Sequence, residues 1–150
     1  MNKKILIAAT RSITINIFLD KFILSSYKKN INISYICSDT KNIDRNLLNN
    51  KFNDFLFSID LPKKAYEFLN IFRILMIIYK LRIFFKKNKF DIIFLHTPVI
   101  SHLIRIATMG LNLNICYFVH GYRFHTKVKF LYKLYFFLIE YILSINTKKY

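Results

Sequence analysis

Two histidines, each placed directly after a short apolar run, are the residues of this chain best suited to chemistry. Residues 92–95 run into His96, and residues 115–119 run into His120. Continuous apolar runs of this length are typical of strands buried on both faces, as in a parallel sheet. Ligands of open parallel sheets bind beyond the carboxyl ends of the strands. We therefore expect His96 and His120 to lie at one ligand-binding edge.

His120 is the candidate catalytic group. Its imidazole donates or accepts a proton near neutral pH, and the adjacent Gly121 allows the backbone to approach a ligand closely. The alternative is a structural histidine at a strand end, hydrogen-bonded to the backbone.

His96, Thr97 and Pro98 form the second candidate group. Pro98 suits the first turn of a helix, where a missing N–H costs nothing. The free N–H groups of that turn suit an anion or a hydroxyl. The alternative, in which Thr97 caps the helix, is compatible with a ligand role.

The segment after His120 is the third candidate. Aromatic faces at Tyr122 and Phe124 suit sugar rings, and Arg123 suits phosphate. The alternative is a hydrophobic loop that packs on the last helix.

Apolar runs must position these residues, and the order of those runs along the chain predicts one α/β domain over residues 1–150. Its sheet is mostly parallel, with helices on both faces and right-handed crossovers. We expect strands at 3–9, 32–37, 55–59, 91–95 and 114–119, and helices at 13–27, 63–87, 98–111 and 128–145. Gly110 is the expected stop signal of the third helix. In the first helix the expected apolar positions are Ile13, Ile17, Phe18, Phe22 and Leu24.

The helix over residues 63–87 is apolar around most of its circumference. Such a helix is either deeply buried or lies on something apolar. We expect its inward stripe to contain Phe68, Leu69, Phe72, Leu75, Met76, Tyr79 and Ile83. Five flanking cations allow the same helix to dock on an anionic membrane surface: Arg73, Lys80, Arg82, Lys86 and Lys87. The alternative is burial of the helix against the sheet.

The formal net charge of +16 comes from 24 basic and 8 acidic residues and attracts polyanions such as nucleic acid or an anionic membrane. The alternative source of the charge is the Lys-rich codon usage of an AT-rich genome. We see no signal peptide and no uncharged run long enough to span a bilayer, so a cytoplasmic protein is expected. Cys37 and Cys116 are then expected to be free thiols.

Several chemistries are disfavoured. The chain has two glycines, Gly110 and Gly121, so it holds neither a dinucleotide fingerprint nor a phosphate-binding loop. Its histidines and cysteines lack the spacing of a metal site. We therefore expect no metal and no bound cofactor.

The sequence at residues 90–98 (FDIIFLHTP) and 114–125 (NICYFVHGYRFH) resembles the N-terminal domain of family 4 glycosyltransferases, in particular the subgroup that builds bacterial capsules and other surface polysaccharides. Residues 4–10 and 139–144 extend the resemblance over nearly the whole chain. It implies a Rossmann-like half of a two-domain enzyme that transfers a sugar, with retention of configuration, from a nucleotide-sugar to a glycan acceptor.

The resemblance also implies roles for residues. It places His120 beside the transferred sugar or its phosphate, and it places acceptor contacts at His96 and Thr97. Substrate contacts are further implied at Arg11, Ser12, Thr14, Gly121, Tyr122, Arg123 and Phe124. The chain departs from the family pattern at four of its usual residues, where it has Thr14, Lys21, Arg123 and Lys127.

The donor site of that family uses two glutamates eight positions apart in the second domain. This chain has only Glu67 and Glu140, so the resemblance implies that the donor-binding domain is absent. We interpret the chain as an incomplete front half arising by frameshift, pseudogene formation or split coding, and inactive by itself. Its expected partners are a lipid-linked glycan acceptor, an anionic membrane and a separately encoded donor-binding domain. The alternative is a non-enzymatic basic module on membranes or nucleic acid, and nucleic acid is less favoured because helices cover the sheet.

Overall fold

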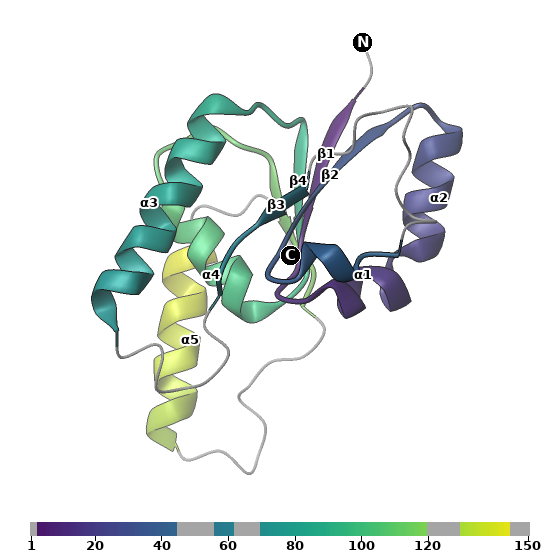
Figure 1. Cartoon of the computed structure of the whole chain (residues 1–150). Helices are drawn as coiled ribbons and strands as arrows, with labels where there is room; N and C mark the ends of the chain where they lie inside the picture. Colours follow the sequence, from purple (N-terminus) through teal and green to yellow (C-terminus); the bar gives the residue numbers. More distant parts are fainter. Residues whose placement is uncertain (1–2, 45–55, 62–69, 120–129, 145–150) are drawn as a thin grey trace.

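The computed structural model describes residues 3–44, 56–61, 70–119 and 130–144. Within them is a parallel sheet of five strands in the order β3-β2-β1-β4-β5. The strands are β1 (Lys4–Ala8), β2 (Asn32–Cys37), β3 (Leu56–Ser58), β4 (Ile92–Leu95) and β5 (Ile115–Tyr117). All four pairings are parallel, which confirms the predicted fold class (Figure 1).

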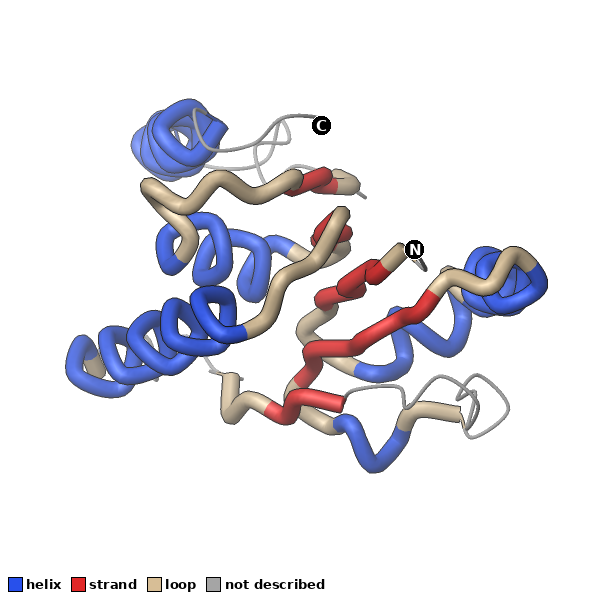
Figure 2. The backbone as a smooth tube through the Cα atoms, turned by 90° about the horizontal axis from the view of Figure 1, so that it is seen from above, coloured by secondary structure: helices blue, strands red, loops and turns tan. Residues whose placement is uncertain are grey.

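Helices cover both faces of the sheet, as Figure 2 shows. They are α1 (Ser12–Phe18), α2 (Asp20–Lys28), α3 (Ile71–Lys87), α4 (Pro98–Ala107) and α5 (Phe130–Ser144), with a short 3₁₀ turn η1 (Thr40–Asn42). Alternate residues of β1 point to opposite cores: Leu6 packs with α3 and α4, whereas Ile7 packs with α1 and α2. Both side chains are fully buried, as expected for a central parallel strand.

The first predicted helix differs from the structure. It is divided at Leu19 into α1 and α2. Its buried stripe is Ile15, Leu19 and Ile23, spaced four residues apart. The apolar positions from which the helix was predicted are all exposed: Ile13, Ile17, Phe18, Phe22 and Leu24. Two apolar stripes fit the helical period here, and the core of α1 and α2 is built from the other one.

The predicted inward stripe of α3 was wrong at Phe72, Leu75, Met76 and Tyr79, which are exposed. Ile83 is partly buried, and Phe68 and Leu69 lie outside the described residues. Ile77, Leu81, Phe84 and Phe85 are buried and pack on the sheet and α4. The exposed side of the helix instead carries what we call the outer strip: Ile71, Phe72, Leu75, Met76 and Tyr79, each more than half exposed. Both sides of α3 are apolar, so periodicity alone does not distinguish the buried side.

α4 ends at Ala107, before the predicted end at residue 111, and the predicted stop signal Gly110 lies just beyond it. Gly110 adopts a left-handed backbone with φ +77 just beyond the helix, a conformation that costs glycine little. The following segment leads into β5 at the edge of the sheet.

A buried ionic cluster joins α4 to α5. The Arg105 side chain is fully buried, and its Nη2 donates to Glu140 Oε2 at 2.8 Å. The other carboxylate oxygen lies 2.8 Å from His102 Nε2, and the Arg105 guanidinium lies 4.5 Å from the centre of the Tyr117 ring. Burial raises the pKa of Glu140, but hydrogen bonds and charges from His102 and Arg105 outweigh it and hold the pKa below its usual range. The cluster therefore needs an ionised Glu140.

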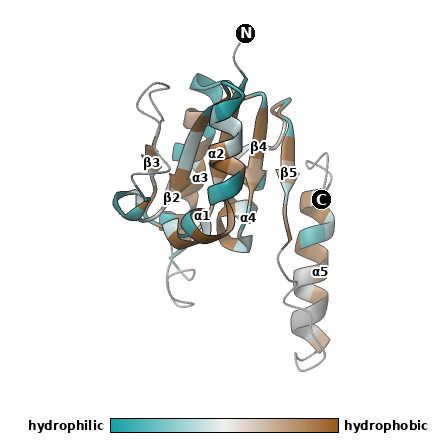
Figure 3. Ribbon diagram, turned by 90° about the vertical axis from the view of Figure 1, so that its right-hand side faces the viewer, coloured by the Kyte–Doolittle hydropathy of each residue, from teal (hydrophilic) through white to brown (hydrophobic). Residues whose placement is uncertain are grey.

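The other side of α5 carries exposed apolar residues: Phe130, Leu134, Phe137, Leu138, Tyr141 and Ile142. Figure 3 shows this helix beside β5, with brown hydrophobic colour along it. Among the described residues, the ionic cluster, the contacts with α4 and the buried Leu143 hold α5 in place.

We expect the substitution Glu140→Gln to lower the free energy of unfolding by about 3 kcal/mol at neutral pH, because it leaves the buried Arg105 charge without its carboxylate. The loss in free energy of unfolding, relative to the unsubstituted chain, should reach its full size above about pH 4.3, the ordinary glutamate pKa. It should vanish as the pH falls through the lower folded pKa. Urea unfolding across pH measures this.

Asp20→Asn in the first turn of α2 is the matched control, with an expected loss of about 0.5 kcal/mol. Equal losses for the two variants at neutral pH would contradict the role given to the cluster.

Candidate functional site

The carboxyl edge of the sheet between β1 and β4 is where the strand order changes direction. From β1 the chain builds β2 and β3 on one side, then crosses to β4 and β5 on the other. Open α/β sheets bind ligands at such a switch point. The sequence-predicted residues of the described chain are gathered around this edge.

Two threonines join the ends of β1 and β4. Thr97 Oγ1 accepts a hydrogen bond from the Thr10 backbone N–H at 2.7 Å and lies 2.6 Å from Thr10 Oγ1. Thr97 stands at the N-cap position of α4, but its side chain makes no capping hydrogen bond. The Thr97 hydroxyl therefore bonds to Thr10, just after β1. The alternative in which the Thr97 side chain caps the helix is wrong.

Asp39, at the end of β2, holds the turn after β1. Its carboxylate accepts from the Ser12 N–H at 2.7 Å and from Ser12 Oγ at 3.0 Å. Burial raises the pKa of Asp39, but these two hydrogen bonds and others nearby outweigh it and lower the pKa below its usual range. The Ser12 hydroxyl thus serves the turn, and its side chain is buried.

The other predicted residues of this turn lie closer to solvent. Arg11 is exposed and occupies the N-cap position of α1. Thr14 is partly buried, and its N–H donates to the Arg11 carbonyl at 3.2 Å. Of the three residues predicted in the turn, Arg11 is therefore the most accessible to a ligand.

His96 lies at the predicted edge but inside the protein. Its backbone N–H donates to the Ala8 carbonyl at 3.0 Å, and its side chain is buried at 5% exposure. The imidazole stacks on the Phe118 ring with centres 5.0 Å apart and planes 2° apart. Phe118 is 47% exposed, so its ring forms part of the surface at the end of β5. The buried His96 imidazole packs against the inner side of that ring.

His120, Gly121, Tyr122, Arg123 and Phe124 lie outside the described residues. The described chain reaches Val119, two residues beyond the end of β5. Because β5 is parallel to β4, its carboxyl end lies at the same edge as His96.

Cys37 ends β2 close to Asp39. Cys37 is a buried free thiol, and Cys116 is a partly buried free thiol. This confirms the prediction of free thiols. Burial is the main cause that raises the Cys37 pKa to about 11. The residue is therefore a protonated thiol at neutral pH and a poor nucleophile.

Sequence reasoning did not single out Thr10, Asp39 or Phe118. Phe118 lies inside the predicted strand over residues 114–119. The signal for Asp39 was its position two residues after a buried strand, close to the rule that selected the two histidines. In the part of the chain that the structure describes, no three histidine, cysteine or acidic side chains are grouped to hold a metal ion.

Comparison with known proteins gives a fold and no family. No protein-family model matches the chain, and no curated protein does. Among solved structures, MurG of Acinetobacter baumannii matches with a TM-score of 0.60 at 14% identity, over 97% of this chain and 40% of MurG. A putative UDP-N-acetylglucosamine 2-epimerase of Listeria monocytogenes matches with a TM-score of 0.61 at 12% identity, over 100% of this chain and 39% of that one.

The UDP-GlcNAc 2-epimerase of Methanocaldococcus jannaschii also matches, with a TM-score of 0.57 at 17% identity, over 95% of this chain and 37% of that one. This chain spans about two fifths of the length of these three proteins. It has the Rossmann-like fold of one half of a GT-B enzyme, the two-domain architecture of many glycosyltransferases.

The threonine bridge yields a stability prediction. Thr97→Val removes the acceptor of the Thr10 N–H and should lower the free energy of unfolding by about 2 kcal/mol. Thr97→Ser keeps the hydroxyl and should cost less than about 1 kcal/mol. Denaturant unfolding of both variants measures the difference, and equal stability of the two would show that the bridge contributes nothing.

Proposed function

We propose that this chain is the acceptor-side domain of a retaining glycosyltransferase of the two-domain type. In this proposal the complete enzyme transfers a sugar from a nucleotide-sugar to a lipid-linked glycan in surface polysaccharide synthesis. The observation that carries the proposal is the switch-point edge, where the turn after β1, Thr97 and the ends of β4 and β5 meet in a GT-B half-domain fold.

The names of the similar structures support the class of substrate. Two of them are epimerases named for UDP-GlcNAc, and another is named as the glycotransferase of kitacinnamycin, with a TM-score of 0.50. The sequence resemblance supports glycosyl transfer over epimerisation, through the His-Thr-Pro and His-Gly segments at 96–98 and 120–121.

Each part of the edge has a proposed role. His120 contacts the transferred sugar or its phosphate. Tyr122, Arg123 and Phe124 make further substrate contacts beside His120. Gly121 allows the backbone to approach the substrate closely. His96 acts by supporting Phe118, whose exposed ring face suits a sugar ring. Arg11 offers a cation to an anionic acceptor.

The donor half is proposed to reside in a second domain, because each similar structure is more than twice as long as the matched part. Stabilising the charge on a leaving nucleoside diphosphate is usually the largest catalytic contribution. Without that domain the edge is one wall of an open crevice, where water weakens each polar contact.

We expect the isolated 150-residue chain to bind no nucleotide-sugar with micromolar affinity and to transfer no sugar. Calorimetry with UDP-N-acetylglucosamine, UDP-glucose and GDP-mannose tests the donor side. A short-chain prenyl-diphosphate N-acetylglucosamine tests the acceptor side by native mass spectrometry. Acceptor binding that is lost in His120→Ala and kept in His125→Ala supports the proposal. Micromolar donor binding, or acceptor binding unaffected by His120→Ala, contradicts it.

A second candidate function is docking on an anionic membrane, favoured by the outer strip of α3. Its five apolar residues face solvent, and Arg73, Lys80 and Lys87 recur every seven residues along one side of it. Apolar surface beside cations is the pattern of a helix lying in the membrane interface. No helix among the described residues is long and apolar enough to cross a bilayer.

The membrane test must avoid Arg82, which donates to the carbonyls of Ala107 and Met109 at 2.9 Å and so joins α3 to the end of α4. We expect the double substitution of Lys86 and Lys87 to Glu to reduce co-sedimentation with phosphatidylglycerol vesicles at least about tenfold. Each basic residue near an anionic surface contributes roughly 1 kcal/mol to binding, and the new carboxylates add repulsion from the lipid headgroups. The same double change at Lys28 and Lys29, at the C-terminal end of α2, is the matched control. Equal losses in both variants, or none in the first, contradict docking through α3.

A further inference from the structure

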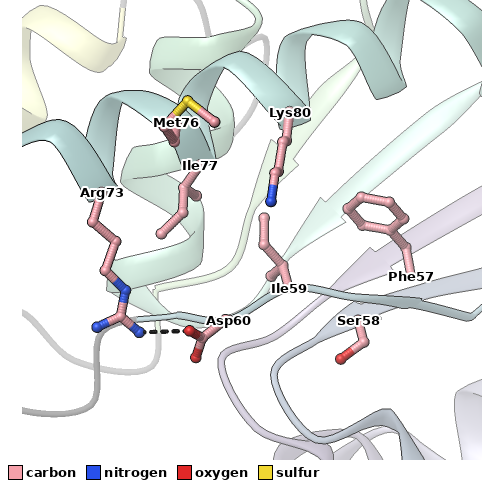
Figure 4. Close-up of a pocket in the computed structure, with 8 residues that line it drawn as sticks. All are labelled: Phe57, Ser58, Ile59, Asp60, Arg73, Met76, Ile77 and Lys80. Carbon is pink, nitrogen blue, oxygen red and sulfur yellow. Dashed lines mark hydrogen bonds and ion pairs between the residues drawn. The ribbon is translucent and has the colours of Figure 1, made fainter.

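A small cavity lies between the end of β3 and the N-terminal half of α3, away from the switch point. It has a volume of about 150 Å³. Figure 4 shows its lining, which consists of Phe57, Ser58, Ile59, Asp60, Arg73, Met76, Ile77 and Lys80. In the sheet β2 separates β3 from β1, so this cavity is distinct from the edge that carries Thr97 and His96.

The cavity has an apolar floor and a charged rim. Ile77 and Ile59 are buried. At the rim, Arg73 Nη2 donates to Asp60 Oδ2 at 2.8 Å, and the Arg73 side chain is 31% exposed. Figure 4 shows the Lys80 side chain directed toward Ile59. The two cations and one carboxylate give the rim a net charge of +1.

The structure ties this rim to the sheet. The Ile59 N–H donates to the Cys37 carbonyl at 3.2 Å, which continues the β2–β3 pairing beyond Ser58. On the helix side, Asn70 Oδ1 accepts from the Arg73 N–H at 3.1 Å and caps α3. Arg73 is thus held at both its backbone and its guanidinium before any ligand arrives, which lowers the ordering cost of binding.

The size and the charge of the cavity define the class of ligand. A cavity of about 150 Å³ holds one benzene-sized group. Lysine binds phosphate as a compact point charge, and arginine binds it with a planar fork of donors. Met76 belongs both to the cavity lining and to the outer strip of α3. An apolar substituent on the phosphate would therefore extend over Met76 along that strip.

We propose that this cavity is a binding site for a phosphate ester that carries an apolar substituent. Lys80 and Arg73 hold the phosphate, Asp60 positions the guanidinium, and Met76 contacts the apolar group. The site goes beyond the proposed sugar transfer and does not depend on it, because none of its residues belongs to the switch-point edge.

The test is calorimetric titration of the full chain with hexyl phosphate below its micelle concentration. We expect saturable binding, weakened at least about tenfold by Lys80→Gln, since a hydrogen bond to a charged group contributes about that factor. Lys28→Gln, the same change on α2 and outside the cavity, should leave the affinity unchanged. Equal weakening by both variants, or no saturable binding, overturns the proposal.

The two halves of hexyl phosphate give a second test of the proposal. Hexanol or inorganic phosphate binding as tightly as hexyl phosphate overturns it as well, because one half of the ligand would then contribute nothing.

Competition identifies the source of the phosphate. Displacement of hexyl phosphate by phosphatidylglycerol vesicles, but not by phosphatidylcholine vesicles, supports a lipid headgroup. Displacement by phenyl phosphate, a soluble phosphate ester with an apolar group, supports a soluble source. If neither the phosphatidylglycerol vesicles nor phenyl phosphate displaces hexyl phosphate, the proposal is overturned.

Discussion

The burial of β1 between two parallel partners is the constraint on which the rest of this structure depends. β1 pairs with β2 on one side and with β4 on the other, and Leu6, Ile7 and Ala8 have no exposed surface. A strand buried on both faces needs helices on both sides. The two cores follow from this, and so does the place where the chain must change direction across the sheet.

That change of direction gathers polar groups from distant parts of the sequence. Thr10 and Thr97 are 87 residues apart in the chain, and Ser12 and Asp39 are 27 apart. Most of these groups are hydrogen-bonded to one another, so they form a rigid support and offer few contacts to a ligand. Among the described residues of this edge, Arg11 and the Phe118 ring stacked on His96 remain accessible to a ligand. An edge of this kind suits the positioning of a ligand.

The unusual amount of exposed apolar surface has a physical consequence. The outer strip of α3 and the free side of α5 are both apolar, while α5 is fastened by a buried charge cluster. A buried ion pair holds one arrangement because a misplaced partner would leave a charge unpaired. The cluster thus helps to orient a helix that also carries exposed apolar residues.

The sequence by itself determined the α/β class, the positions of the strands, the free thiols and the edge where His96 lies. These follow from short apolar runs and the polar residues that end them, which are local signals. Tertiary structure alone decided which sides of α1, α2 and α3 are buried, because each helix offers more than one apolar side. It also decided that Thr97 bonds to Thr10, that Arg105 pairs with Glu140 and that His96 lies beneath Phe118. These pairs depend on which strands and helices become neighbours, and no local pattern encodes that.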